Sequence, residues 1–183
     1  IVMGTSFGGF VAMAYATRHP EHPGKLILNT TSAKWTLDRV LRVFERLGGK
    51  GAREAARRYW ENPNMETGTE YIRVCMPLYN HHQRGPEMMA RTVFNFDLMF
   101  NFGTKAQRDM NFIPGLGRIK CPTLVMGGDD DPITPIEDSA DIAEALPREL
   151  VRFERFPATG HGIVNDSPER FFKVLREFIG QQE

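Results

Sequence analysis

The sequence is poor in cysteine: only Cys75 and Cys121 occur in 183 residues, far apart and each in an apolar stretch. A disulfide-stapled fold needs several cysteines at regular spacing. We therefore expect two buried free thiols and a reducing, cytoplasmic compartment. The paired His81 and His82 lack a Cys, Asp or Glu at metal-ligand spacing, so we expect neither a metal nor another cofactor.

The sequence also lacks net charge, because 23 Lys and Arg balance 23 Asp and Glu. Proteins that bind nucleic acids or anionic membranes usually carry a basic surface, so the balance argues against both as main partners. No apolar run approaches the roughly 20 residues that cross a bilayer, and no signal peptide is visible. The remaining class is a soluble globular chain, long enough for one hydrophobic core.

What the sequence does contain is the pattern G-T-S-F-G at residues 4–8, between an apolar run and a helix-like run. Strand, tight turn and helix are the context of a nucleophile elbow. The turn would strain Ser6 and expose its hydroxyl, and we expect a Cβ at Gly4 or Gly8 to collide with the neighbouring strand or helix. N–H groups at the helix N-terminus, that of Phe7 first, would stabilise a developing oxyanion.

A serine nucleophile needs a base, and the base needs an orienting carboxylate. His161 lies on a glycine-flanked loop after the alternating run 150–156. This is the carboxyl end of a predicted strand, where open α/β sheets place their chemistry. We therefore assign His161 as the base. The other histidines lie in polar segments punctuated by proline or glycine and are interpreted as surface residues: His19, His22, His81 and His82.

Three aspartates, Asp129, Asp130 and Asp131, follow the buried-strand pattern at 121–128. We choose Asp131 as the orienting carboxylate because it completes a G-x-x-D pattern and precedes Pro132, which favours an extended backbone. We expect Asp129 and Asp130 to be solvated. The chain order is thus serine, aspartate, histidine.

These three motifs, in this order and on these loops, resemble an α/β-hydrolase-fold enzyme. The resemblance implies an α/β fold with a mostly parallel sheet. Residues 1–33 and 113–183 would form the hydrolase core, and residues 34–112 a helical cap over the active site. The strands that precede the nucleophile in this fold are absent from the sequence, as is the loop with the second oxyanion donor. We therefore expect a preceding segment to complete the sheet, since a nucleophile strand at its edge would be left unpaired.

The spacing of apolar residues, together with proline and glycine at the ends of segments, predicts the remaining helices and strands. We expect strands at 1–3, 25–29, 121–128 and 150–156. Helices are expected at 8–18, at 134–146 with a capping box from Thr134 to Glu137, and at 167–180. Cap helices are expected at 35–47, 51–61, 66–78 and 87–99. The run at 94–102 fits either a pocket wall or an amphipathic helix packed on the main domain.

The resemblance implies a cofactor-independent serine hydrolase that forms an acyl-enzyme on Ser6 from a small-molecule ester, lactone or amide. A serine nucleophile is unlike the haloalkane dehalogenase and epoxide hydrolase branches, which use aspartate. Carbon–carbon bond hydrolysis and perhydrolysis use the same triad and stay open. A non-catalytic ligand receptor on the same fold is a further alternative. The sequence does not predict the oligomeric state.

A proline iminopeptidase is a further alternative. The cap segments 44–49 and 73–79 loosely resemble those of proteins grouped with that family, which holds the substrate amine with cap carboxylates. Phe7 stands where that family has tryptophan after the serine, which argues against the peptidase. Carboxylesterase or lactonase activity is an equal contender. Five glutamates are available for the amine: Glu45, Glu54, Glu61, Glu66 and Glu70.

Overall fold

The computed structural model describes residues 1–82, 85, 87, 90, 91, 93, 95 and 107–180. Within this part of the chain, four parallel strands form one sheet in chain order: β1 (Val2–Thr5), β2 (Leu26–Asn29), β3 (Thr123–Gly128) and β4 (Val151–Phe156). Thr5 pairs with Asn29, Asn29 with Met126, and Met126 with Glu154. The strands therefore end nearly level, so the loops that follow them meet at one edge of the sheet.

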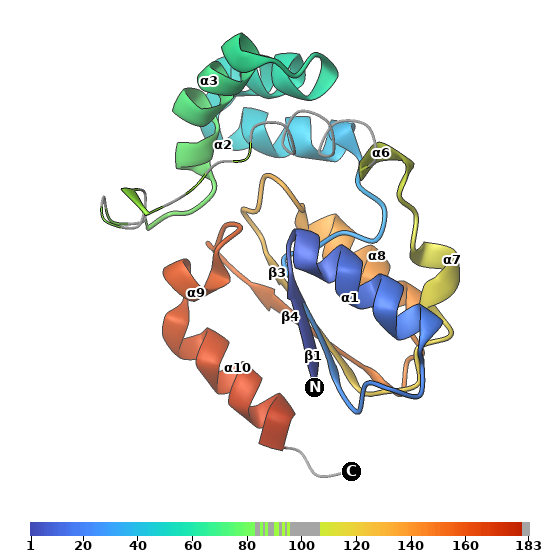
Figure 1. The fold of residues 1–183 in the computed structure, drawn as a ribbon. Coiled ribbons are helices and arrows are strands. Elements are labelled where there is room, and N and C mark those ends of the chain that lie inside the picture. Colours follow the sequence, from blue (N-terminus) through green and yellow to red (C-terminus); the bar gives the residue numbers. More distant parts are fainter. Residues whose placement is uncertain are drawn as a thin grey trace.

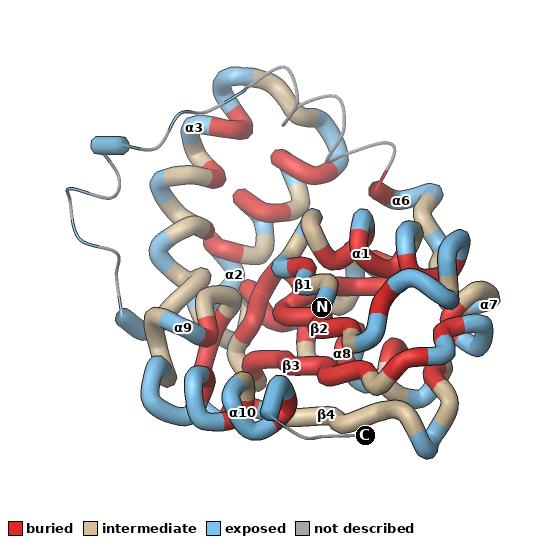
Figure 2. Tube along the Cα trace, turned by 60° about the horizontal axis from the view of Figure 1, so that its bottom comes forward, coloured by how far each residue is buried: buried red, intermediate tan, exposed pale blue. Residues whose placement is uncertain are grey.

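Helices cover both faces of this sheet (Figure 1). One face packs on α1 (Phe7–Arg18), α7 (Ile113–Leu116) and α8 (Ile136–Ala145), and the other on α9 (Ile163–Asp166) and α10 (Pro168–Gly180). Leu26 and Leu28 of β2 point to the first face and Ile27 to the second. Figure 2 shows β2 and β3 buried along their whole length, as expected for strands covered on both sides.

A separate helical layer, residues 35–82, lies over the carboxyl ends of the strands (Figure 1). It consists of α2 (Leu37–Glu61), α3 (Met65–Val74) and the 3₁₀ turn η1 (Met76–Leu78). Its aromatic side chains form a core of their own: Trp35, Phe44, Tyr59, Trp60 and Tyr71. The backbone of Gly49 breaks α2 at φ 72°, between the two helices expected at 35–47 and 51–61.

Two of the helices expected between residues 34 and 112 are not described as single helices. The helix expected at 66–78 divides into α3 and η1, because Pro77 has no backbone N–H with which to continue the first helix. The helix expected at 87–99 and the run at 94–102 lie largely outside the described residues. The short α6 (Gln107–Asp109) and α7 were not expected from the sequence.

The two cysteines are free and buried, as predicted. Cys75 belongs to the core of the helical layer, whereas Cys121 belongs to the core between the sheet and α1. Burial raises the pKa of the Cys75 thiol to about 12 and that of Cys121 above its usual value. Among the described helices, none combines the length and the apolar character that a membrane crossing requires.

Candidate active site

Ser6 occupies the sharp turn between β1 and α1. Its φ of 52° and ψ of −121° are rare for any residue other than glycine. The predicted strain at this position is therefore confirmed. The Ser6 side chain makes no capping bond to α1, so the hydroxyl is not occupied by the helix that it precedes.

The end of β2 supports this turn through the backbone. The Ser6 N–H donates to the carbonyls of Asn29 and Thr30, at 3.0 and 3.1 Å. The Thr31 hydroxyl donates to the Ser6 carbonyl at 2.8 Å, and the Gly9 N–H donates to the same oxygen at 2.9 Å. The strained conformation is thus fixed from both sides.

The glycines around Ser6 differ from expectation at one position. A Cβ on Gly4 would collide with the Gly8 carbonyl, which confirms the close approach predicted there. The same prediction for Gly8 is wrong, because a Cβ on Gly8 would meet nothing within 4 Å. Gly9 is the second tight position, since its Cβ would collide with the Thr31 side chain. The helix turns so that Gly9, and not Gly8, faces the segment that follows β2.

Asp131 and His161 lie on the loops after β3 and β4, and the structure brings them together. The His161 Nδ1 and an Asp131 carboxylate oxygen are 2.8 Å apart. The Asp131 side chain is fully buried, and that of His161 is 17% exposed. The N–H groups of Ile133 and Thr134 donate to the other carboxylate oxygen at 2.8 and 3.0 Å. The carboxylate is therefore held in one orientation toward the imidazole.

Thr134 was expected to cap the following helix, and this prediction is wrong. Its hydroxyl donates instead to the Asp131 Oδ2 at 2.7 Å, and α8 begins only at Ile136. The same hydroxyl lies 3.5 Å from the His161 Nδ1. Because its acceptor is charged, the bond to Asp131 is stronger than a neutral one and holds the Thr134 side chain there.

Ser6 lies at the same edge of the sheet as the Asp131–His161 pair. Within the described part of the chain, no hydrogen bond joins the Ser6 hydroxyl to the His161 ring. Phe7, the residue proposed for the oxyanion, begins α1, and its half-exposed ring meets Phe10 edge to face at 6.1 Å. The structure thus pairs two of the predicted site residues and places the third on the adjoining elbow.

Asp129 and Asp130 are not the solvated residues that we expected. Asp129 forms an ion pair with Arg155 at 3.1 Å. Asp130 pairs with Arg46 of α2 and with the His81 Nε2, the latter at 2.8 Å. Burial alone would raise the pKa of Asp130, but the hydrogen bonds from Arg46 and His81 bring it below its usual value. Sequence reasoning missed these contacts because each partner is distant along the chain.

The remaining histidines show no metal centre. His19 and His22 stack at 5.2 Å, and the Tyr15 hydroxyl lies 3.0 Å from the His22 Nδ1. His82 Nδ1 lies 3.5 Å from the Asp166 carboxylate. Over the described ranges, no group of three or more His, Cys, Asp or Glu residues is arranged to hold a metal ion.

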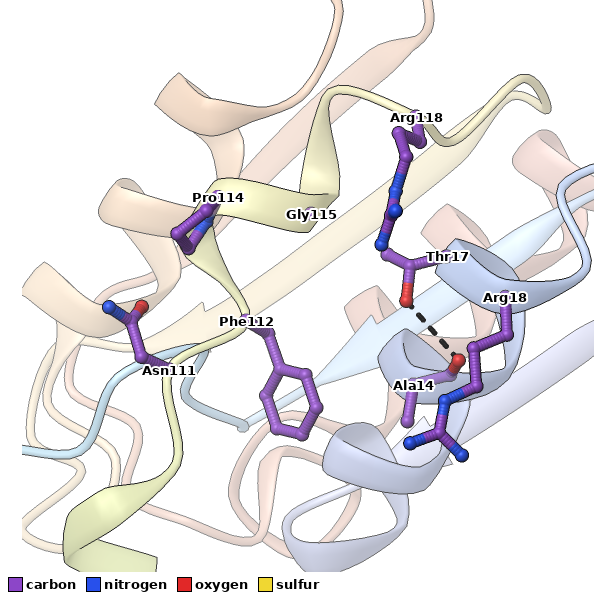
Figure 3. Close-up of a pocket in the computed structure, with 8 residues that line it drawn as sticks. All are labelled: Ala14, Thr17, Arg18, Asn111, Phe112, Pro114, Gly115 and Arg118. Atoms are coloured by element: carbon purple, nitrogen blue, oxygen red, sulfur yellow. Dashed lines mark hydrogen bonds between the residues drawn. The ribbon is translucent and has the colours of Figure 1, made fainter.

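A pocket of about 430 Å³ lies between α1 and α7, away from this site (Figure 3). Thr17 and Arg18 line it from the far end of α1, together with Phe112 and Arg118. At 1.5 Å per residue, the eleven steps from Phe7 to Arg18 put this pocket about 16 Å along the helix from the elbow. It contains none of the predicted catalytic residues.

Known proteins are similar to this chain along nearly its whole length, at about a quarter identity. The first relative is a 2-hydroxy-6-oxononadienedioate/2-hydroxy-6-oxononatrienedioate hydrolase of Paraburkholderia phymatum, 26% identical over 98% of this chain and 62% of its own length. A pimeloyl-[acyl-carrier protein] methyl ester esterase of Chromobacterium violaceum is 25% identical over 99% of this chain and 70% of its own. The chain thus spans about two thirds of the length of these relatives.

The fold has close matches among solved structures. The α/β-hydrolase enzyme MGS-M2, from a Medee basin deep-sea metagenome library, superposes with a TM-score of 0.69 at 21% identity, covering 99% of this chain and 65% of its own. The fold is therefore the α/β-hydrolase fold. Residues 1–168 match the family model described as "Serine aminopeptidase, S33". Since that match covers nearly the whole chain, the chain belongs to the S33 serine aminopeptidase family of α/β-hydrolases.

Proposed function

We propose that this chain carries the catalytic residues of a cofactor-independent serine hydrolase, with Ser6 as nucleophile, His161 as base and Asp131 as orienting acid. Its substrate is a small-molecule ester, lactone or amide. The observation that carries the proposal is the strained Ser6 elbow at a helix N-terminus, on the sheet edge that also holds the hydrogen-bonded Asp131–His161 pair.

In the acylation step, the Ser6 hydroxyl oxygen attacks the acyl carbon while the His161 Nε2 takes the hydroxyl proton. Asp131 accepts a hydrogen bond from the Nδ1–H and stabilises the imidazolium that forms. The Phe7 N–H, at the positive end of α1, contributes one hydrogen bond to the oxyanion. When the intermediate collapses, the bond to the leaving group breaks and His161 returns the proton to the departing alcohol or amine.

Deacylation runs the same proton path with water. His161 takes a proton from the water molecule as its oxygen adds to the acyl carbon of the ester on Ser6. The second intermediate collapses when the bond to the Ser6 oxygen breaks and that oxygen regains the proton. The products are a carboxylic acid and the free enzyme, so no oxidant, reductant or metal takes part.

The helical layer would act as the cap of the site, within the division 1–33, 34–112 and 113–183. The Tyr79 ring, just after η1, stands edge to face with the His161 ring at 5.8 Å and 78°. Its hydroxyl bonds to that of Tyr71 at 2.7 Å, which ties it to the core of the helical layer. These contacts support a layer that borders the catalytic histidine and restricts what reaches it.

The alternative of a proline iminopeptidase has the family description in its favour, but most of its candidate glutamates are already paired. Four of the five glutamates form ion pairs with helix arginines: Glu45, Glu54, Glu61 and Glu70. Glu66 lies in the first turn of α3. Because most of these carboxylates already have cationic partners on their own layer, we favour an ester or lactone as substrate.

Treatment of the full-length protein with a fluorophosphonate tests the nucleophile. We expect one adduct by intact mass, mapped to Ser6 by peptide analysis and absent in Ser6→Ala. Ser167→Ala is the matched control and should label normally, since Ser167 precedes α10 on the opposite face of the sheet. An adduct elsewhere, or none on the folded protein, would contradict the assignment.

Turnover then distinguishes the alternatives. We expect hydrolysis of a short-chain chromogenic aryl ester, lowered about 10³-fold or more in Ser6→Ala, as for other triad serines. A strong preference for a proline arylamide over the ester would favour the iminopeptidase. Tight ligand binding without turnover of either substrate would favour a receptor.

A further inference from the structure

The segment of residues 79–82, which we call the connector, runs from the helical layer along the loop that carries His161. The Tyr79 carbonyl accepts a hydrogen bond from the His161 N–H at 2.7 Å. The Asn80 Oδ1 accepts one from the Gly162 N–H, also at 2.7 Å. The backbone of the catalytic histidine is thus bonded directly to a segment of the helical layer.

Asp166, at the end of α9, binds both of these segments at once. Its Oδ2 accepts hydrogen bonds from the N–H groups of Gly160 and His81, at 2.8 and 3.1 Å. Its Oδ1 accepts one from the His82 N–H at 2.8 Å. The side chain is fully buried. Charge-assisted bonds of this kind are about twice as strong as neutral ones, so one carboxylate joins the histidine loop to the connector.

Glycines let the two backbones approach closely. A Cβ on Gly160 would collide with the Tyr79 carbonyl, and one on Gly162 would collide with the Asn80 side chain. The histidine loop in turn crosses over Gly128, where a Cβ would collide with the Thr159 carbonyl. The connector, the histidine loop and the end of β3 therefore pack without intervening side chains, and a shift of one must displace the next.

The connector also contacts the loop that carries the orienting acid. The His81 Nε2 lies 2.8 Å from the carboxylate of Asp130, whose neighbour is Asp131. Arg46 of α2 binds the same carboxylate and also the Asp129 carbonyl, the latter at 3.0 Å. Both residues of the Asp131–His161 pair thus have the helical layer bonded within one residue of them.

We propose that Asp166 is a positioning residue for catalysis, which sets the place of the His161 ring by fastening the histidine loop to the connector. The proposal rests on the proposed hydrolase function. Asp166 does not touch the imidazole, and it acts through the backbone of Gly160, His81 and His82. Proton transfer from Ser6 depends on the distance and angle of that imidazole, and a misplacement of about 1 Å can lower the rate about 100-fold.

The test is Asp166→Asn in the full-length protein. The amide keeps one acceptor oxygen but turns its NH₂ group toward a backbone N–H, so at least one of the three bonds is lost. We expect kcat for an aryl ester to fall between about 10- and 100-fold, with KM within about twofold. The rate of fluorophosphonate labelling at Ser6 should fall in parallel, in a protein that circular dichroism shows to be folded at the assay temperature.

Glu169→Gln is the matched control, because it removes the same charge from an exposed position in the first turn of α10. It should leave kcat, KM and labelling unchanged. If wild-type protein labels at Ser6 and Asp166→Asn labels equally fast with unchanged kcat, the inference is wrong and the hydrolase function stands. A change in KM alone would also overturn it. Wild-type protein that does not label at Ser6 would overturn both proposals.

Asn80→Ala tests whether the connector positions the histidine loop if Asp166→Asn fails to fold. This variant removes only the acceptor for the Gly162 N–H, at a position on the other side of the same junction. A folded Asn80→Ala protein with lowered kcat and unchanged KM supports positioning by the connector. A folded variant with wild-type kcat overturns it.

Discussion

At the scale of single residues, the elbow shows how backbone strain is held in place. A positive φ at a residue other than glycine costs about 1–3 kcal/mol. At Ser6 the hydrogen bonds with Asn29, Thr30 and Thr31, at the end of β2 and just after it, offset that cost. The Ser6 hydroxyl is left without a capping bond to α1.

The glycines of the elbow give a matched pair of variants. Gly4→Ala should destabilise the protein by about 2 kcal/mol or more, because the new methyl group overlaps the Gly8 carbonyl and the backbone must shift. Gly8→Ala should be neutral or stabilising by up to about 1 kcal/mol, since it adds a helix-favouring residue where there is room. Urea unfolding measures both, and equal losses in the two variants would contradict the geometry.

The positions of the candidate site residues in the fold followed from the sequence where its pattern is local. Ser6 and His161 are marked by flanking glycines and by a preceding strand, so their places followed from neighbours in the chain. Asp130 was misjudged because its partners Arg46 and His81 come from the helical layer. Asp166 was not singled out, since a buried carboxylate bound to backbone N–H groups leaves no sequence pattern.

At the scale of elements, one ion pair joins the helical layer to α8. Arg39 of α2 lies 2.8 Å from the buried carboxylate of Asp138 and also bonds to Asp141. The Asp138 Oδ2 has no hydrogen-bond partner in the described structure. Burial therefore outweighs the pairing with Arg39, and the pKa of Asp138 is raised from 3.8 to about 6.

This shift gives the stability a defined pH dependence. Between pH 3.8 and about 6 the folded state keeps a proton that the unfolded state releases. Protonation of Asp138 therefore stabilises the folded state fully at low pH. As the pH rises through 6, the free energy of unfolding falls by roughly 3 kcal/mol in total. Asp138→Asn should remove this loss and be more stable than the wild type at pH 8 but not at pH 4.

Urea unfolding at both pH values measures the difference. Asp141→Asn is the control, because Asp141 binds the same arginine but is 38% exposed. It should keep most of the wild-type pH dependence, because burial and not the charge of Asp141 is the main cause that raises the Asp138 pKa. An Asp138→Asn variant that is less stable than the wild type at pH 8 would show that the ion pair outweighs the cost of burial.

Elements with strong periodicity were predicted within about two residues. Examples are β4 and α10, whose apolar positions follow strand and helix spacing. The start of α8 was wrong because the Thr134 side chain bonds to Asp131 and makes no capping bond to the helix, a contact that the sequence spacing does not show. Such a contact depends on loop geometry that only the folded chain fixes.

At the scale of the whole molecule, the two edges of the sheet differ. Charged side chains protect β4: Arg152 pairs with Glu154 and Glu177 at 2.9 Å. On β1, by contrast, Met3 is 45% exposed, and Ile1, just before the strand, is 66% exposed; neither carries a side-chain charge. An uncharged open edge is a site for strand addition. We propose that a further parallel strand of the whole protein pairs with β1.

Hydrogen exchange in the full-length protein tests this. The Val2 and Ser6 N–H groups donate toward β2, at 2.9 and 3.0 Å, so strand alternation turns those of Met3 and Thr5 toward the open edge. We expect both amides to exchange slowly, like Val125 of the central β3. Rapid exchange at Met3 and Thr5, as fast as at Glu21 in an exposed turn, would show that the edge stays unpaired.

The order of the main-domain elements followed from the resemblance of three short motifs to a known fold. The position of the helical layer on the main domain did not follow from these motifs. It depends on pairs such as Tyr79 with His161 and Arg39 with Asp138, which are 82 and 99 residues apart. Contacts over such separations carry no periodic pattern, so they emerge only when the chain is folded.

The two buried cysteines make this molecule a reporter of its own unfolding. Each thiol lies in a different core, Cys75 within the helical layer and Cys121 between the sheet and α1. Burial keeps both as unreactive thiols, so an alkylating reagent reaches each only after its own core has opened. Timed alkylation would thus read the order of events: Cys75 modified first means that the helical layer opens as a separate unit, and simultaneous modification means that both cores unfold together.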